Sequence, residues 1–376
     1  MRAARAAGRV ALDTEFLWER TYAPVPCLIQ ISDGHEIWLI DPVEGAPLEP
    51  LSELLADASV VKVMHAPASD LTLFALRFST GQAAIRDTQT AAGFVGLGAG
   101  ASLGTLLERC LGRVLAKTES YSDWSRRPLS EAQLDYAADD VRYLLDLDDE
   151  IERRAVELGR DLWVDEEVER RFGPSTTWAT SPDDAWRRVK GQGRLSGPER
   201  AALRSLAGWR EDSARRRDRP LQWILPDRVL VELARRRPKD KSALSNIRGL
   251  PEGLSGADRE IILSGLTESR TATPPDAAPA VPPDRRDRVE MLGTLGSALL
   301  AARGAALDIA PSLVASREEI GQLMLAVVEG REPAGQLMGG WRAEVAGEAL
   351  VALANGRVAL VPHHEPPYVR ELPAGD

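Results

Sequence analysis

Strand-forming sequence is confined to the first part of this chain, and this asymmetry limits the folds that the chain can adopt. Apolar runs with strand character occur at 10–12, 27–31, 37–40 and 60–64. The Asp33-Gly34 pair between the second and third runs is a strong hairpin signal. We therefore predict an α/β domain with a mixed sheet that opens with three antiparallel strands.

Apolar residues at helical spacing occur between these strands, and farther along the chain only helical spacing is found. We predict one long helix over 130–149, in which Ser130 and Gln133 form a capping box. From about Asp183 onward the strand signals vanish, and short helices alternate with Pro and Gly. The predicted units are an α/β domain at 1–172, a helical domain at 183–266, a Pro-rich linker at 267–288, a second helical domain at 289–356 and a frayed tail at 357–376.

The residue counts exclude several classes of protein. Only Cys27 and Cys110 are present, together with four histidines, so neither a disulfide framework nor a Cys/His zinc site is supplied. No apolar run approaches the roughly 20 residues of a bilayer span, and the N-terminus lacks the features of a signal peptide. We therefore expect a cytoplasmic protein without membrane partners, in which carboxylates hold any metal.

Charge is distributed unevenly along the chain. The whole chain of 376 residues carries a net charge of −10. Residues 187–248 contain 18 basic and 7 acidic residues, a net of +11, which leaves −21 for the remainder. Such a basic block is typical of a polyanion-binding surface, although a solvated Arg-rich helical surface has the same composition.

Asp13 and Glu15 follow the first apolar run at a spacing of two residues. Side chains at this spacing project from the same face of a strand. Two adjacent carboxylates repel each other unless a cation or a proton lies between them, and a hard divalent ion prefers oxygen ligands. The alternative is an exposed strand face with both acids in water.

Two later segments supply further acids. Asp70 begins a helix after the fourth strand and could be only its N-cap. Tyr136 and Asp140 lie four residues apart and share one face of the predicted long helix, whose inner side also carries Leu134. Asp139 is rotated by about 100° from this face, where solvent is expected. An acid on the buried side of a helix is costly unless it is paired or bound to metal, which singles out Asp140.

Three sequence segments together resemble the motifs of a known enzyme family. ALDTEF at 11–16, HAPASDL at 65–71 and YAADDV at 136–141 resemble, in order and spacing, the three exonuclease motifs of the DEDDy class. LIQI at 28–31 and the segment 123–145 are similar to ribonuclease D in particular. Residues 183–266 resemble the helicase-and-RNase-D C-terminal (HRDC) domain, and the region after Arg288 resembles a second copy more weakly.

The resemblance implies a ribonuclease H-like mixed sheet followed by two small all-α HRDC-like domains. It also implies that two divalent ions, Mg²⁺ or Mn²⁺, are bound by four acids and that a tyrosine orients the attacking water. The matching residues are Asp13, Glu15, Asp70 and Asp140 for the metal and Tyr136 for the water. The implied reaction is 3′→5′ removal of nucleoside 5′-monophosphates from RNA 3′ ends, with tRNA precursors as the substrate class and no obligate protein partner. A leading segment usual in ribonuclease D is expected to be absent.

Other residues admit two interpretations each. Gln30 either faces the site or hydrogen-bonds within the sheet, and His65 either contacts substrate or ends its strand. Lys117 either touches a phosphate or is solvated, while Asp87 is interpreted as a helix cap. Four tryptophans are assigned to helical cores rather than to base stacking: Trp178, Trp186, Trp209 and Trp223.

Two other functions remain open at this level. A DNA exonuclease of the same class would carry the same acids, and no clear reader of the ribose 2′-hydroxyl decides between them. A catalytically silent RNA-binding protein would not need five polar groups facing one cleft. Metal binding by the four acids is the observation that separates the enzyme from the silent protein.

Overall fold

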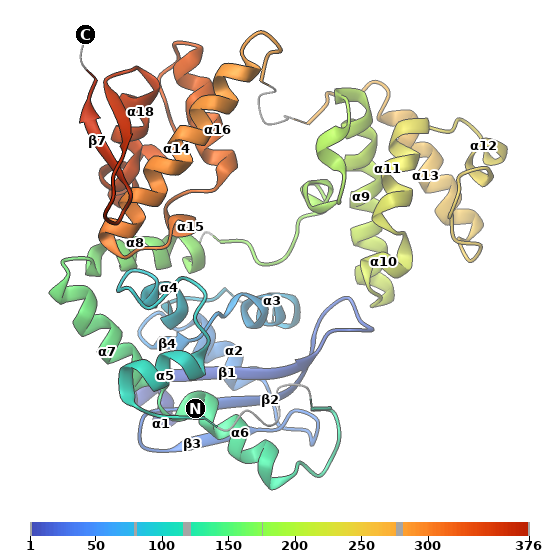
Figure 1. The fold of residues 1–376 in the computed structure, drawn as a ribbon. Coiled ribbons are helices and arrows are strands. Elements are labelled where there is room, and N and C mark those ends of the chain that lie inside the picture. The colour runs from blue at the N-terminus through green and yellow to red at the C-terminus, as the bar shows by residue number, and fades with distance from the viewer. Residues whose placement is uncertain (1, 79–80, 116–121, 175, 276–280, 375–376) are drawn as a thin grey trace.

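The computed structural model describes residues 2–78, 81–115, 122–174, 176–275 and 281–374. It consists of an α/β domain, a first helical domain and a second helical domain (Figure 1). The α/β domain contains the strands β1 (Arg9–Leu17), β2 (Val25–Ser32), β3 (Ile37–Ile40), β4 (Val61–Met64) and β5 (Ile85–Asp87). Its helices are α1 (Arg2–Ala7), α2 (Glu49–Ala56), α3 (Ala68–Arg77), α4 (Thr88–Ala92), α5 (Leu103–Leu111), α6 (Glu131–Arg142), α7 (Leu144–Glu157) and α8 (Asp161–Phe172).

The sheet has the order β3-β2-β1-β4-β5. The pairs β1–β2 and β2–β3 are antiparallel, while β1–β4 and β4–β5 are parallel. The predicted mixed sheet and its three opening antiparallel strands are therefore confirmed. The sequence analysis missed β5, because a three-residue strand is too short to show a period. This order makes β1 the central strand, with a hydrogen-bonded neighbour on each side.

The prediction of one helix over 130–149 is wrong. The chain turns at Tyr143 (φ −115°, ψ 8°) and forms two helices, α6 and α7. Helix α6 packs on β1, β2 and β3, whereas α7 packs on α4 and α5, so the break lets each apolar face cover a different surface. Leu134, assigned to the inner face, is exposed. The predicted capping box at Ser130 and Gln133 is present.

The first helical domain has a hydrophobic core of its own. Its helices are η1 (Ala185–Arg188), η2 (Gln192–Arg194), α9 (Gly197–Arg217), α10 (Leu221–Ile224), α11 (Asp227–Arg236), α12 (Lys241–Ser245) and α13 (Gly256–Glu268). Trp186 and Trp209 lie in this core, as predicted. Trp223 is 57% exposed, so its assignment to a helical core is wrong. Trp178 is half-buried and packs against a different core, the one that contains Phe172 of α8.

The second helical domain repeats part of this order. Its helices are α14 (Arg286–Leu307), α15 (Pro311–Val314), α16 (Arg317–Val328), η3 (Gln336–Met338), α17 (Gly340–Arg342), a π turn (Ala343–Gly347) and α18 (Glu348–Ala354). In both domains a helix of 21 or 22 residues ends at a left-handed aspartate, Asp218 or Asp308, and a four-residue helix follows. No helix in the described part of the chain is both long and apolar enough to cross a bilayer.

The structure differs from the sequence analysis at the predicted linker and at the predicted tail. Helix α13 ends at Glu268 and α14 begins at Arg286, so helices occupy both ends of the predicted linker 267–288. The predicted frayed tail contains an antiparallel hairpin of β6 (Val358–Pro362) and β7 (Val369–Pro373). Glu371 of β7 accepts hydrogen bonds at 2.6 and 2.8 Å from Arg303 of α14, and this tertiary ion pair has no local sequence signal.

The second helical domain shares one continuous hydrophobic core with the α/β domain. The Trp341 ring packs edge-on against Phe94 at 4.9 Å and stacks on Trp163 at 5.8 Å. Beside it, Arg342 donates to buried Glu167 of α8 at 2.6 Å. Burial alone would raise the pKa of Glu167, but hydrogen bonds from three arginines lower it to about 2. These two units therefore form one packed body.

We predict that Trp341→Ala destabilises this whole body by about 3–5 kcal/mol, since the side chain is 1% exposed and its loss leaves a cavity. Urea unfolding followed by circular dichroism measures the change. Trp223→Ala is the control, because an exposed side chain contributes within about 0.5 kcal/mol. An α/β domain that unfolds at the same urea concentration in wild type and Trp341→Ala would contradict the shared core.

Candidate active site

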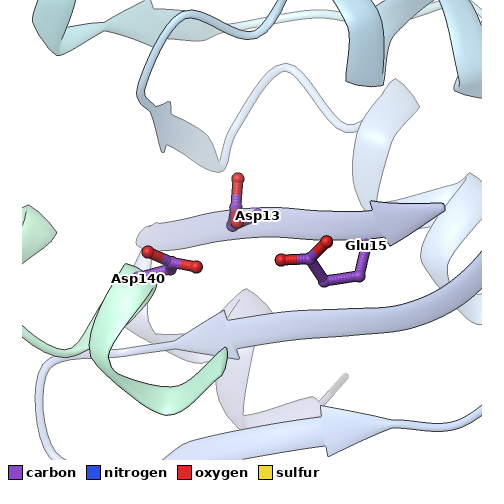
Figure 2. Close-up of side chains that lie close together, drawn as sticks. All are labelled: Asp13, Glu15 and Asp140. Atoms are coloured by element: carbon purple, nitrogen blue, oxygen red, sulfur yellow. The ribbon is translucent and has the colours of Figure 1, made fainter. Parts of the chain in front are cut away.

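Three carboxylates converge at the centre of the sheet. Asp13 and Glu15 extend from β1, and Asp140 extends from α6, which crosses above that face (Figure 2). Each offers an oxygen, and these oxygens lie within 4.8 Å of one another. The alternative of an exposed strand face is thus wrong: Asp13 and Glu15 are part-buried beneath α6. The i, i+2 spacing on a central strand produces this arrangement.

Asp70 approaches the same carboxylates from α3. It is the third residue of that helix, whose N-cap is Pro67, so the N-cap interpretation of Asp70 is wrong. Its side chain is 6% exposed, and its Oδ1 accepts a hydrogen bond from the Thr14 hydroxyl. The charge of Asp70 raises the pKa of Asp13 and of Glu15, which places it in the same electrostatic cluster. Thr14 was not singled out from the sequence, where it is only the residue between two acids.

These acids hold protons unusually well. Burial, followed by repulsion from the other acids, raises the pKa of Asp13 well above its ordinary value and that of Glu15 to about 8. Burial raises the pKa of Asp140 to about 7 and that of Asp70 to about 6. Buried, mutually repelling oxygen ligands are relieved by a cation, and an all-carboxylate set suits a hard divalent ion. The acidic cluster therefore fits a divalent metal as its cofactor.

Tyr136 lies one helical turn before Asp140 on α6. Its ring packs against Trp124 at 6.0 Å between ring centres. The segment that leads into α6 is held by Arg127, which donates at 2.6 Å to each carboxylate oxygen of Asp41 and at 2.8 Å to the carbonyl of Cys27. Sequence analysis missed Arg127, because this contact joins residues 86 positions apart. It sets where α6, and with it Tyr136 and Asp140, lies over the sheet.

Gln30 of β2 lies directly opposite Asp13 in the strand register. Cross-strand partners project from the same face of a sheet, so Gln30 lies on the acidic side. It is fully buried, and neither polar atom of its amide has a hydrogen-bond partner among the described residues. This observation disfavours a hydrogen bond within the sheet. A buried amide without partners costs about 1–3 kcal/mol per group, so Gln30 is a candidate to bind a group at the acidic site.

The remaining predicted residues lie away from the acidic cluster or outside the described residues. His65 ends β4, and its Nδ1 lies 2.9 Å from the Thr88 hydroxyl, which itself donates to the Met64 carbonyl. Burial lowers the pKa of His65. These contacts favour its structural interpretation. Asp87 caps α4, as predicted, by accepting from the backbone N–H groups of two residues in its first turn. Lys117 lies outside the described residues.

We predict that the metal-free protein loses stability as pH rises from about 4 to about 8. In that window the folded state keeps protons on Glu15, Asp70 and Asp140 that the unfolded chain has already released. Urea unfolding in EDTA at several pH values measures the slope. Glu15→Gln should flatten it, exposed Glu19→Gln should leave it unchanged, and Mg²⁺ should restore stability at pH 8. An equal slope in wild type and Glu15→Gln would contradict the assignment.

Comparison with known proteins agrees with this geometry. The model of the 3′-5′ exonuclease domain family matches residues 1–155, and that of the HRDC domain matches residues 199–255. The chain is 37% identical to the ribonuclease D of Acidiphilium cryptum over 374 residues, which cover 97% of this chain and 92% of the relative. It is 36% identical to the ribonuclease D of Granulibacter bethesdensis over 362 residues, which cover 93% and 88% of the two chains.

A solved structure gives the same result at the level of the fold. The crystal structure of Escherichia coli RNase D superimposes with a TM-score of 0.76 at 30% identity, over 94% of this chain and 95% of that chain. The expected mixed sheet and the expected HRDC domain are thereby confirmed. The chain belongs to the ribonuclease D family and is a hydrolytic 3′→5′ exoribonuclease.

Proposed function

We propose that this exoribonuclease trims the 3′ ends of structured RNA, with tRNA precursors as its main substrate class, and that it uses two divalent ions. The observation that carries the proposal is the convergence, within 4.8 Å, of oxygens from Asp13 and Glu15 of β1 and from Asp140 of α6. Asp70 completes the set through its charge on the first two. Four carboxylates carry twice the charge that one divalent ion neutralises, which favours a pair of ions.

The acids and Tyr136 have separate tasks in this proposal. Asp13, Glu15, Asp70 and Asp140 hold the ions, which when bound stabilise charge on the phosphoryl oxygens and make water a better nucleophile. Tyr136 orients the attacking water through its hydroxyl, since it shares the inner face of α6 with Asp140. The ring contact with Trp124 fixes the phenol, so little ordering is needed when RNA binds.

Gln30 is proposed as a positioning residue for this site. Its amide lies across the strand pair from Asp13 and has no hydrogen-bond partner among the described residues. The nitrogen can donate to the Asp13 carboxylate or to a water molecule beside it, which holds the carboxylate in its ligating orientation. Because an amide is neutral, Gln30 does not change the charge of the four acids, and these acids still favour a hard divalent ion.

RNA is proposed to bind mainly through the first helical domain. Its segment 187–248 carries a net charge of +11, while the rest of the chain carries −21. Exposed cations without a salt bridge among the described residues include Arg194, Arg235, Lys239 and Arg248. Phosphate contacts of this kind position RNA without reading its sequence. A tRNA precursor joins a folded polyanionic body to a single-stranded 3′ extension, which suits a basic domain beside a buried site.

Two further observations support a substrate-binding role for the first helical domain and a scaffold role for the second. The Escherichia coli relative is described as an exoribonuclease involved in structured RNA processing. The repeated order of a long helix, a left-handed aspartate and a four-residue helix supports the interpretation of 289–356 as a second HRDC-like unit. Its shared core with the α/β domain suits a scaffold role, and the separate core of 183–266 suits a substrate-binding role.

We expect Asp140→Asn to lower activity at least about a thousandfold and to weaken Mn²⁺ binding, because metal-dependent catalysis fails as a unit. Tyr136→Phe should lower kcat about a hundredfold or more while Mn²⁺ affinity stays near wild type. Degradation of 3′-labelled RNA and calorimetric Mn²⁺ titration measure the two effects.

Asp139→Asn is the matched control for these variants, because Asp139 neighbours Asp140 but pairs with Arg142 at 2.8 Å outside the cluster. It should retain activity. More than a tenth of wild-type activity in Asp140→Asn would overturn the metal assignment. Loss of metal from Tyr136→Phe would make the tyrosine a structural support. A DNA oligomer of the same sequence, tested in parallel, decides between RNA and DNA as the preferred substrate.

A second expectation concerns salt. Replacing Arg235, Lys239 and Arg248 by Gln should weaken binding to a tRNA precursor and flatten its dependence on salt. Each lost phosphate contact changes the slope of log affinity against log salt by about 0.7–0.9. The control is a triple Gln variant of exposed cations in the second helical domain and the tail hairpin: Arg317, Arg357 and Arg370. Equal slopes in wild type and the first variant would mean that the basic block is only a solvated surface.

A further inference from the structure

A cavity of about 260 Å³ lies at the junction between the α/β domain and the first helical domain. Its walls come from the β1–β2 loop, from α3, from the segment after α8 and from η1, α9 and α10 of the helical domain. Figure 1 shows the β1–β2 hairpin reaching toward α10 at the lower end of that domain. None of the residues assigned to the acidic cluster lines this cavity.

Two elements that carry acids of the cluster, β1 and α3, also lead to the wall of the cavity. Trp18, which lines it, follows Glu15 by three residues, a distance of about 10 Å along an extended chain. Thr72, on the same wall, follows Asp70 by two residues within α3. The two elements that carry Asp13, Glu15 and Asp70 therefore also lead into the cavity wall.

Two indole rings with fixed orientations line the cavity. Trp18 is 45% exposed, and its indole N–H donates to the Tyr22 carbonyl at 3.0 Å. Trp178 is half-buried and stacks on Phe172, with ring centres 5.8 Å apart and planes at 7°. Aromatic rings held in this way are platforms on which bases of single-stranded nucleic acid stack, whatever their sequence.

The polar groups of the cavity favour a ligand that carries acceptors. Arg188 is exposed and has no carboxylate partner among the described residues. Gln222 accepts a hydrogen bond from the Asp227 N–H at 3.2 Å through its oxygen, and its amide nitrogen donates to no group among the described residues. The one carboxylate in the wall, Glu211, accepts a hydrogen bond from the Tyr22 hydroxyl at 2.6 Å. A nucleotide matches this lining, because its base can stack on an indole ring and its phosphate can accept from the guanidinium and the amide.

The junction itself is held by Tyr22. Besides its bond to Glu211, its ring lies under the guanidinium of Arg215 at 5.6 Å, and its backbone N–H donates to Asp218 at 3.0 Å. These contacts tie the β1–β2 loop to α9, so the two walls of the cavity keep their spacing. A preformed site of this kind requires little reordering on binding.

We propose that this cavity binds one nucleotide of the RNA strand upstream of the 3′ end, with its base on Trp18 or Trp178 and its phosphate beside Arg188. The inference rests on the proposed function, because the acidic cluster must hold the 3′ end for the strand to reach the cavity. It adds a recognition site between the catalytic centre and the basic surface, which lets the enzyme favour strands that extend beyond the terminal nucleotides.

The test compares RNA oligomers of two and ten nucleotides. Trp18→Ala should lower the preference for the decanucleotide over the dinucleotide, measured as a ratio of kcat/KM values, by about fivefold to a hundredfold, and Trp18→Phe should recover most of it. Trp223→Ala is the matched control, since Trp223 lies next to Gln222 on α10 and is similarly exposed but does not line the cavity. An unchanged preference in Trp18→Ala and in Trp178→Ala would overturn the proposal.

Binding without turnover keeps this test separate from that of the proposed function. Fluorescence anisotropy of a labelled decanucleotide in EDTA should show weaker binding to Trp18→Ala than to wild type, even if no RNA is degraded. A wild type that binds but never degrades RNA would contradict the proposed function alone. If 5′-AMP binds as tightly as the decanucleotide and Trp18→Ala weakens both equally, the cavity is a mononucleotide site and the strand assignment is wrong.

Discussion

Repulsion among buried carboxylates is the constraint on which the rest of this structure depends. Asp13, Glu15 and Asp140 lie within reach of one ion. Burial raises the pKa of all three, and repulsion from Asp140 and Asp70 raises the pKa of Asp13 and of Glu15 further. Such a cluster does not stabilise the fold by itself, so the surrounding elements must hold it in place until a cation arrives. The order of the sheet meets this need, because the strand that carries two of the acids is hydrogen-bonded on both sides.

Support for the third acid comes from outside the sheet. Arg127 anchors the segment before α6 to Asp41 and to the Cys27 carbonyl, and the break at Tyr143 frees α6 from the direction of α7. Helix α6 can then cover the acidic face while α7 packs elsewhere in the core. The same face carries Gln30, a buried amide without hydrogen-bond partners among the described residues, for which we propose a positioning role beside Asp13.

The two helical domains are attached to this body in different ways. The second is fused to it through a continuous core around Trp341 and through the buried pair of Arg342 and Glu167. Gly93 belongs to this contact, since a Cβ there would lie 2.5 Å from the Leu313 side chain. The first keeps its own core and meets the α/β domain through Tyr22 and a cavity. Rigid packing on one side and a hydrogen-bonded junction with a cavity on the other fit a scaffold and a substrate surface respectively.

The sequence by itself determined the acids, the tyrosine, the strand period and the basic block, because each depends on local spacing or on composition. Asp13 and Glu15 share a face for the same reason in any strand, and Ser130 caps its helix through neighbours three residues away. Only the tertiary structure decided that Asp70 is held by Thr14, that α6 ends at Tyr143, that the tail forms a hairpin against Arg303 and that Trp178 lines a junction. These features depend on contacts between residues far apart in the chain, which no local pattern encodes.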